Sequence, residues 1–129
     1  MKALTVRNPW AECIAQGVKL VENRTRRTKH RGPLAIHAGA AWAAIGGLDD
    51  RVEKALAGRW RFTYGAVIAT VNVIDCHPAA DGCCAPWGDH LPDVQVFHWV
   101  LADVQRLDNP VPAKGRLGLW DIDLQETPA

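Results

Sequence analysis

The sequence predicts an α+β fold, a small mixed β-barrel with short helices packed over its openings. Two observations support this prediction. Apolar runs rich in Val, Ile and Thr predict more strands than helices along the 129-residue chain. The expected helices are also too short to cover both faces of a doubly wound parallel sheet. A barrel whose ends are covered by those helices satisfies both constraints.

Six segments have strand-like patterns. The segment 64–75 is apolar on both faces over much of its length, which indicates a central strand. The segment 18–24 is a strand or an extended stretch that follows the first helix. In chain order, the expected strands are residues 3–7, 18–24, 34–38, 64–75, 97–107 and 117–124.

The first expected helix, residues 9–16, has the clearest boundary signals. Asn8 can accept a backbone N–H bond at its start, and Pro9 suits the first helical position. Gly17 fits the left-handed position just past its end. Two further helices are expected over residues 40–46 and 49–58.

Length and composition predict one domain over residues 1–129, with a core from about residue 3 to residue 124. No apolar run is long enough to span a bilayer as a helix, and the N-terminus lacks the apolar stretch of a signal peptide. We therefore expect a cytoplasmic protein with no membrane segment. In that compartment the four cysteines are not expected to form disulfides.

Basic residues are concentrated near the N-terminus. Residues 1–33 hold eight Lys and Arg and two acidic residues, a net charge of +6. The remaining 96 residues hold seven basic and twelve acidic residues, a net charge of −5. Such segregation indicates a basic face for an anionic partner such as nucleic acid, although a solvated surface cluster would have the same composition.

Within this basic region, residues 17–24 contain the pattern G-x-K-x-x-E-x-R, with charged groups at Lys19, Glu22 and Arg24. In a regular strand Lys19 points away from the other two, so all three converge only if a turn follows Gly17. Glu22 could then hold the Arg24 guanidinium for a phosphate, and Lys19 would add a second positive charge. The alternative is an ordinary surface pair that contributes about 0–1 kcal/mol.

Three further motifs accompany this pattern: Asn8-Pro9-Trp10-Ala11 before it, Arg31-Gly32-Pro33-Leu34 after it, and Gly115-x-x-Gly118-Leu119-Trp120 near the end. The combination resembles the ASCH domain family of the PUA-like superfamily over residues 3–124. The resemblance implies a PUA-like barrel and a cleft between the barrel and the helices. It also implies a nucleic-acid partner, RNA or single-stranded nucleic acid.

Similar proteins include nucleic-acid-binding modules, stand-alone ribonucleases and hydrolases of N4-acylated cytidine. The main expectation is an RNA-binding domain, and the sequence leaves open whether it also cleaves RNA as a ribonuclease; Lys19, Glu22 and Arg24 are the catalytic candidates. The hydrolases use a threonine three residues after the motif lysine, but Glu22 occupies that position and Thr25 is out of register. A small amidohydrolase for a modified nucleoside is therefore the alternative. A protein-interaction domain with a vestigial cleft is a third hypothesis.

Other cations and aromatic residues extend the expected binding surface. Arg7 is expected to extend this surface, and Trp10 either packs in the core or stacks on a base. Residues 25–33 form a basic loop that is expected to contact phosphates through Arg26, Arg27, Lys29 and Arg31. Trp87 is the candidate for an exposed stacking residue. The tryptophans expected in the core or at interfaces are Trp42, Trp60, Trp99 and Trp120.

His37 and His98 are candidate acid–base groups, since an imidazole titrates near neutral pH, but the sequence cannot place them near Lys19. The segment 76–92 is rich in side chains of types that bind zinc. Its spacing fits a standard zinc site poorly, because two of its cysteines are adjacent and no C-x-x-C pair is present. The sequence therefore assigns no metal and no cofactor. It leaves open whether a metal is bound by Cys76, His77, Cys83, Cys84 and His90.

Overall fold

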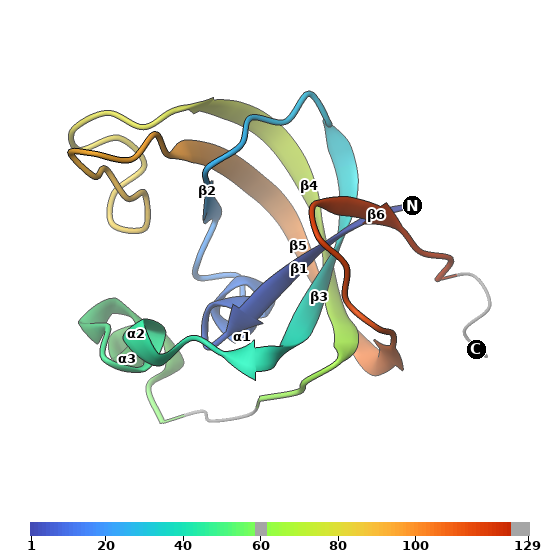
Figure 1. Ribbon diagram of the computed structural model, residues 1–129. Helices are drawn as coiled ribbons and strands as arrows, with labels where there is room; N and C mark the ends of the chain where they lie inside the picture. Colours follow the sequence, from blue (N-terminus) through green and yellow to red (C-terminus); the bar gives the residue numbers. More distant parts are fainter. Residues whose placement is uncertain (59–61, 125–129) are drawn as a thin grey trace.

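The computed structural model describes residues 1–58 and 62–124. Within these residues the order along the chain is one strand, one short helix, two strands, two short helices and three strands (Figure 1). The strands are β1 (Lys2–Asn8), β2 (Val21–Arg24), β3 (Gly32–Trp42), β4 (Ala66–Pro78), β5 (Phe97–Pro112) and β6 (Leu119–Asp121). The helices are α1 (Trp10–Ala15), α2 (Ala44–Gly47) and α3 (Asp50–Leu56).

The strands form one mixed sheet in the order β2-β5-β4-β3-β1-β6. Strands β1 and β3 are parallel, and the other neighbouring pairs are antiparallel. Register shifts along the β4–β5 pair bend the sheet, and Figure 1 shows β4 and β5 arching over the helices. The α+β class and the mixed sheet are as predicted. The sheet is curved like a barrel but not closed, because β2 and β6 are its edge strands and do not pair with each other.

Helix α1 lies within the predicted residues 9–16, but its N-cap is Pro9 and has no side-chain capping bond, so the predicted cap at Asn8 and first helical position at Pro9 are each wrong by one residue. The Asn8 side-chain oxygen nevertheless accepts a hydrogen bond from the Glu12 backbone N–H at 3.2 Å. Gly17 has a φ of +78°, so it supplies the left-handed residue that ends the helix. The backbone N–H groups of Val18 and Lys19 both donate to the Cys13 carbonyl oxygen, at 3.2 and 3.1 Å. The chain therefore turns sharply before β2 begins.

The predicted helix over residues 40–46 is wrong, because β3 continues to Trp42. Trp42 pairs with Asn8 of β1, and the Ala43 backbone N–H donates to the Asn8 carbonyl oxygen at 2.8 Å. Pairing with β1 thus overrides the helix propensity of an alanine-rich segment. Helix α2 follows later and is shorter than predicted. Helix α3 agrees with the prediction for residues 49–58, and the Asp49 side chain caps it by accepting from the Arg51 N–H.

The main core fills the space between the concave face of the sheet and α1. It includes Leu4, Ile14, Ile36, Ile68 and Trp99. Cys13 is fully buried on the other side of α1, and burial raises the pKa of its thiol to about 11. This thiol is therefore an inert packing group. No helix among residues 1–58 and 62–124 is long and apolar enough to cross a membrane.

The tryptophans differ from expectation in two places. Trp99 and Trp120 are buried, as predicted. Trp42 is 40% exposed and packs edge-to-face on Phe62, and Trp60 lies outside the described residues. Trp87 is only 7% exposed, so the expectation of an exposed stacking residue is wrong. It packs with the smaller core cluster around Val52 and Leu56 instead.

Candidate functional site

The three charged residues of the motif converge on one carboxylate. Lys19 Nζ lies 3.1 Å from Glu22 Oε1, and Arg24 Nε lies 2.9 Å from Glu22 Oε2. Glu22 and Arg24 lie on the same face of β2, whereas Lys19 reaches this face because the chain turns after Gly17. The condition set by the sequence is therefore met, and Glu22 is held between two cations.

This arrangement is not an ordinary surface pair. The side chains of Lys19 and Glu22 are only 4% and 9% exposed. Lys19 Nζ also donates to the Val21 carbonyl oxygen, and Arg24 Nη2 donates to the Thr5 carbonyl oxygen at 2.6 Å. The Arg24 side chain is 30% exposed. Its guanidinium plane is therefore fixed by Glu22 and β1 while part of it still faces solvent.

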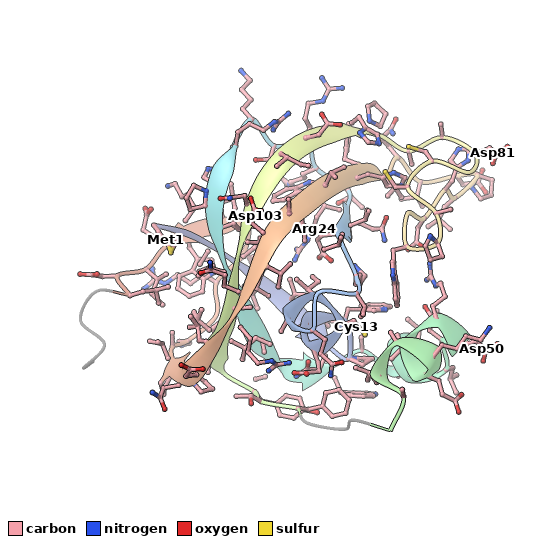
Figure 2. The ribbon with its side chains drawn as sticks, turned by 180° about the vertical axis from the view of Figure 1, so that it is seen from behind. Met1, Cys13, Arg24, Asp50, Asp81 and Asp103 are labelled. Atoms are coloured by element: carbon pink, nitrogen blue, oxygen red, sulfur yellow. The ribbon has the colours of Figure 1, made fainter. Side chains whose placement is uncertain are left out.

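A cavity of about 430 Å³ opens beside these three residues. Two of the predicted nucleic-acid contacts, Arg7 and Trp10, line it from β1 and the start of α1. In Figure 2 the labelled Arg24 lies between the curved sheet and the helices. The lining residues are Thr5, Val6, Arg7, Trp10, Lys19, Glu22, Asn23, Arg24, Thr25, Arg51 and Asp89.

Arg51 and Asp89 form a wall that the sequence analysis missed. Arg51 of α3 pairs with Asp49 at 2.7 Å and with Asp89 at 3.4 Å. Its hydrogen bonds hold the pKa of the Asp49 carboxyl below its usual range. The Arg51 guanidinium also lies 5.2 Å from the centre of the Trp87 ring, a cation–π contact. No local pattern marks Arg51 as a groove residue, because Asp89 and Trp87 belong to a loop that is distant in the sequence.

Asn23 fastens the 76–92 loop to β2. Its side-chain NH₂ donates to the Trp87 carbonyl oxygen at 2.9 Å. Its side-chain oxygen accepts from the Asp89 N–H at 2.8 Å. Asn23 occupies the variable position between Glu22 and Arg24 in the G-x-K-x-x-E-x-R motif, and its side chain attaches the loop to β2. The loop therefore closes one side of the first cavity, as expected for a long loop in a compact domain.

A second cavity of about 610 Å³ adjoins the first. Arg24 and Thr25 line both cavities. Arg26 and Arg27 line the second cavity from the basic loop, and Arg27 stacks over Phe97 with 5.2 Å between the guanidinium carbon and the ring centre. The two cavities therefore adjoin at Arg24 and Thr25, at the end of β2, and arginines line both; together they are called the groove.

Two of the residues predicted to contact nucleic acid do not line this groove. Lys29 and Arg31 line neither cavity. Arg31 instead donates to the carbonyl oxygens of Thr28 and His30, at 3.1 and 2.9 Å. The basic loop is therefore divided. Its first half faces the groove, and its second half stabilises its own turn.

The two candidate acid–base histidines also lie elsewhere. His37 is buried in β3, where its ring nitrogens contact Thr5 Oγ1 at 3.2 Å and the Ala113 carbonyl oxygen at 2.6 Å. His98 is buried beneath the 76–92 loop. Neither lines either cavity. Of the described residues that face the groove, only Lys, Arg, Glu and Asp side chains carry ionisable groups.

Comparison with known proteins assigns the family. A family model described as ASCH domain matches residues 4–111. The chain belongs to the ASCH domain family. This confirms the resemblance of its motifs and its PUA-like architecture. Within this ASCH domain, the groove lies between β1, β2, the helices and the 76–92 loop.

Two curated relatives match most of this ASCH domain. The chain is 26% identical over 132 residues to human (Homo sapiens) activating signal cointegrator 1, covering 93% of the chain and 22% of the relative. It is 24% identical over 138 residues to the mouse (Mus musculus) protein of the same name, with the same coverage of 93% and 22%. The chain thus spans about a fifth of the length of these relatives.

Solved structures show the same fold. The crystal structure of ASCH from Zymomonas mobilis has a TM-score of 0.58 at 12% identity, covering 97% of this chain and 89% of that one. A mutant form of the Zymomonas mobilis protein has a TM-score of 0.61 at 13% identity, covering 97% and 91%. At this identity the likeness concerns the fold alone.

Proposed function

We propose that this ASCH domain binds single-stranded RNA along the groove on β2. The observation that carries the proposal is the pair of cavities that share Arg24 and Thr25. A polymer needs a continuous groove with cations spaced along it, because its phosphates repeat. Arg7, Arg24 and Arg27 supply such cations from three separate segments of the chain.

The groove also offers a surface for a base. Trp10 lines the first cavity and is only partly buried, so its ring can accept a stacked base, which contributes about 1–3 kcal/mol per base. The fixed guanidinium plane of Arg24 suits a phosphate, which arginine contacts through two parallel N–H bonds. The ASCH resemblance, which implies an RNA partner, supports the same proposal.

The geometry supports binding more directly than cleavage. Each Glu22 carboxylate oxygen already accepts a hydrogen bond from a cation, at 3.1 Å from Lys19 and 2.9 Å from Arg24. Each oxygen keeps a second lone pair, but the Glu22 side chain is only 9% exposed, which limits its contact with a ribose hydroxyl. Lys19 and Arg24 would stabilise negative charge on a phosphoryl group. A ribonuclease activity of this chain would therefore require Glu22 to become more accessible from the groove.

Binding is tested by fluorescence anisotropy with labelled single-stranded RNA, hairpin RNA and single-stranded DNA over a range of salt concentrations. Arg7→Ala and Arg27→Ala should each weaken RNA binding about fivefold at 0.1 M salt. Each lost phosphate contact lowers the slope of log K against log salt by about 0.7 for a single strand. Relative to 1 M salt, a slope change of about 0.7 corresponds to a factor of about five in affinity at 0.1 M salt. Lys54→Ala is the matched control, since Lys54 is an exposed cation on α3 outside both cavities.

The same samples are analysed on denaturing gels for cleavage. Binding that is independent of salt, or equal losses in all three variants, would contradict the proposal. Binding without cleavage would support a binding module and reject the ribonuclease activity. The salt slope should not change in Lys29→Ala, because Lys29 lies outside the groove.

A nucleoside amidohydrolase is the second candidate, and the first cavity favours it. A volume of about 430 Å³ lies within the range of about 300–1,000 Å³ typical of small-molecule sites. The buried Lys19–Glu22 pair lies at its wall. Release of carboxylate from N4-acylated cytidine by the wild-type protein, lost in Glu22→Gln, would support this function. An absence of release would leave RNA binding as the function of the groove.

A further inference from the structure

Four metal-binding side chains that line neither cavity meet at the base of the 76–92 loop, whose first residues, up to Pro78, belong to β4 rather than to a loop as predicted. They are His77 at the end of β4, Cys83 and Cys84 in the following turn, and His98 in β5. One ligand atom from each lies within 4.8 Å of the other three. His77 and His98 are paired across β4 and β5, so the sheet itself sets two of the four positions.

Two of the three distances between these atoms are within about 0.2 Å of those in a tetrahedral metal site, and the His77 Nε2–Cys83 Sγ distance of 3.0 Å is about 0.6 Å shorter. Cys83 Sγ and Cys84 Sγ lie 3.6 Å apart, and His77 Nε2 lies 3.0 and 3.5 Å from the two sulfurs. With Zn–S bonds of about 2.3 Å and Zn–N bonds of about 2.05 Å, tetrahedral geometry requires an S–S separation of about 3.8 Å and S–N separations of about 3.6 Å. The adjacent cysteines, which fit a standard zinc spacing poorly, therefore do face a common centre. Cys84 has a φ of +58°, and this turn lets both sulfurs face His77.

In each histidine, one ring nitrogen forms a hydrogen bond with a carboxylate or a carbonyl oxygen, as metal-bound histidines do. His77 Nδ1 contacts the Asp75 carboxylate at 2.7 Å, and His98 Nε2 contacts the Asp89 carbonyl oxygen at 2.8 Å. Both partners are acceptors, so these nitrogens carry the protons. The opposite nitrogens, His77 Nε2 and His98 Nδ1, are therefore left with lone pairs. This is the tautomer and orientation that a carboxylate or carbonyl imposes on a metal-bound histidine.

His98 Nδ1 gives an independent indication of a ligand. His98 is fully buried, and among the described residues no group forms a hydrogen bond with its Nδ1 atom. A buried nitrogen without a partner is unfavourable, so such atoms are rare unless something occupies the space beside them. The His98 and His77 rings face each other edge-to-face with centres 5.4 Å apart. A metal ion bound to both histidines would satisfy the Nδ1 atom.

We propose that His77, Cys83, Cys84 and His98 bind one Zn²⁺ ion in a closed, structural site. Two thiolates and two neutral imidazoles form the Cys₂His₂ donor set of structural zinc, and two thiolates balance the charge of the ion. Each cysteine that is a thiol before binding releases its proton to solvent. Four protein ligands leave no open position, so the ion would hold the loop rather than activate water.

The proposed ion would cross-link three parts of the chain, namely β4, β5 and the turn at Cys83 and Cys84. It would link the ends of β4 and β5 to the turn that leads to Trp87 and Asp89. Asp89 also contacts His98 through its carbonyl oxygen and lines the groove. The zinc site would therefore support the loop that forms one wall of the groove. Its test does not depend on whether the groove binds RNA.

The first experiment measures metal in the intact wild-type protein. The protein is stripped of metal and reduced, and is then titrated with Zn²⁺ while bound metal is measured by mass spectrometry under native conditions. We expect one Zn²⁺ per chain. Titration with Co²⁺ should give the visible absorption of tetrahedral cobalt and a thiolate-to-cobalt charge-transfer band. Less than half an equivalent of bound Zn²⁺, or an octahedral Co²⁺ spectrum, would overturn the proposal.

Variants then identify the ligands. Cys83→Ser and Cys84→Ser should each weaken Zn²⁺ binding at least tenfold and reduce the intensity of the charge-transfer band. Cys76→Ser and His90→Ala are the matched controls, because Cys76 accepts from the Thr28 N–H and His90 contacts Asp81. Equal losses in controls and ligand variants would place the metal elsewhere and overturn the assignment. The wild-type titration keeps the test decisive if a variant fails to fold.

Discussion

The buried charge cluster around Glu22 makes a quantitative prediction about stability. The Glu22→Gln substitution keeps the side-chain volume but removes the charge that Lys19 and Arg24 share. Lys19, with a side chain only 4% exposed, would then be a buried cation without a counter-charge. Breaking a buried pair in this way costs about 3–5 kcal/mol of unfolding free energy.

We expect a loss at the lower end, about 3 kcal/mol. Lys19 keeps its hydrogen bond to the Val21 carbonyl oxygen, and the partly exposed Arg24 remains solvated. For a chain of this length about 1 kcal/mol corresponds to about 4 °C in Tm, so Tm should fall by about 12 °C. Lys19→Met should cost less, about 2 kcal/mol, because Glu22 would still be paired with Arg24.

A double-mutant cycle measured by urea denaturation separates pairing from packing. The double variant Lys19→Met with Glu22→Gln should be more stable than the sum of the single losses predicts, by about 2 kcal/mol, since it buries neither unpaired charge. Lys2→Met is the matched control. Its partner Asp121 is 76% exposed, so the loss should not exceed about 0.5 kcal/mol. A loss below about 1 kcal/mol for Glu22→Gln, or additive single losses, would refute this account.

Two further predictions concern the framework around the groove. Glu12 is 2% exposed and pairs with Arg106 of β5, so Glu12→Gln should lower the free energy of unfolding by about 3 kcal/mol. Urea denaturation checks this, and a loss below about 1 kcal/mol would contradict it. Gly88 packs against the Cys83 carbonyl oxygen, and an added Cβ would lie 2.7 Å from His98 Cε1. Gly88→Ala should therefore destabilise the protein by about 1–3 kcal/mol and reduce bound Zn²⁺, and unchanged metal content would disprove the close approach.

Local sequence signals were sufficient where the interactions are short in range. Asn8 and Gly17 mark the two ends of α1 to within one residue, because a side-chain acceptor ahead of the helix and a left-handed residue after it act within a few positions. The turn after Gly17 also made the convergence of Lys19, Glu22 and Arg24 a condition that could be stated in advance. The burial of Lys19 could not be stated, because residues of distant strands and helices cover it.

Longer-range pairing changed the prediction elsewhere. The alanine-rich segment before Trp42 has helix propensity, but its hydrogen-bond partner is Asn8 on β1, far from it in the sequence. The same limitation hid Arg51, which reaches the groove only because α3 packs beside the 76–92 loop. It also hid the role of Trp87, which lies in a polar loop but fills a gap between α1 and α3.

The sequence by itself therefore determined the α+β class, the start and end of α1, the basic N-terminal region and the chemistry of the motif. These depend on residue type and on neighbours within one or two turns. The tertiary structure decided that the sheet stays open, which half of the basic loop faces the groove, and which cysteines and histidines meet. His77 and His98 are separated in the chain by the connection over residues 79–96, and the pairing of β4 with β5 brings the two together. Such contacts arise from strand register and loop closure, which no local pattern encodes.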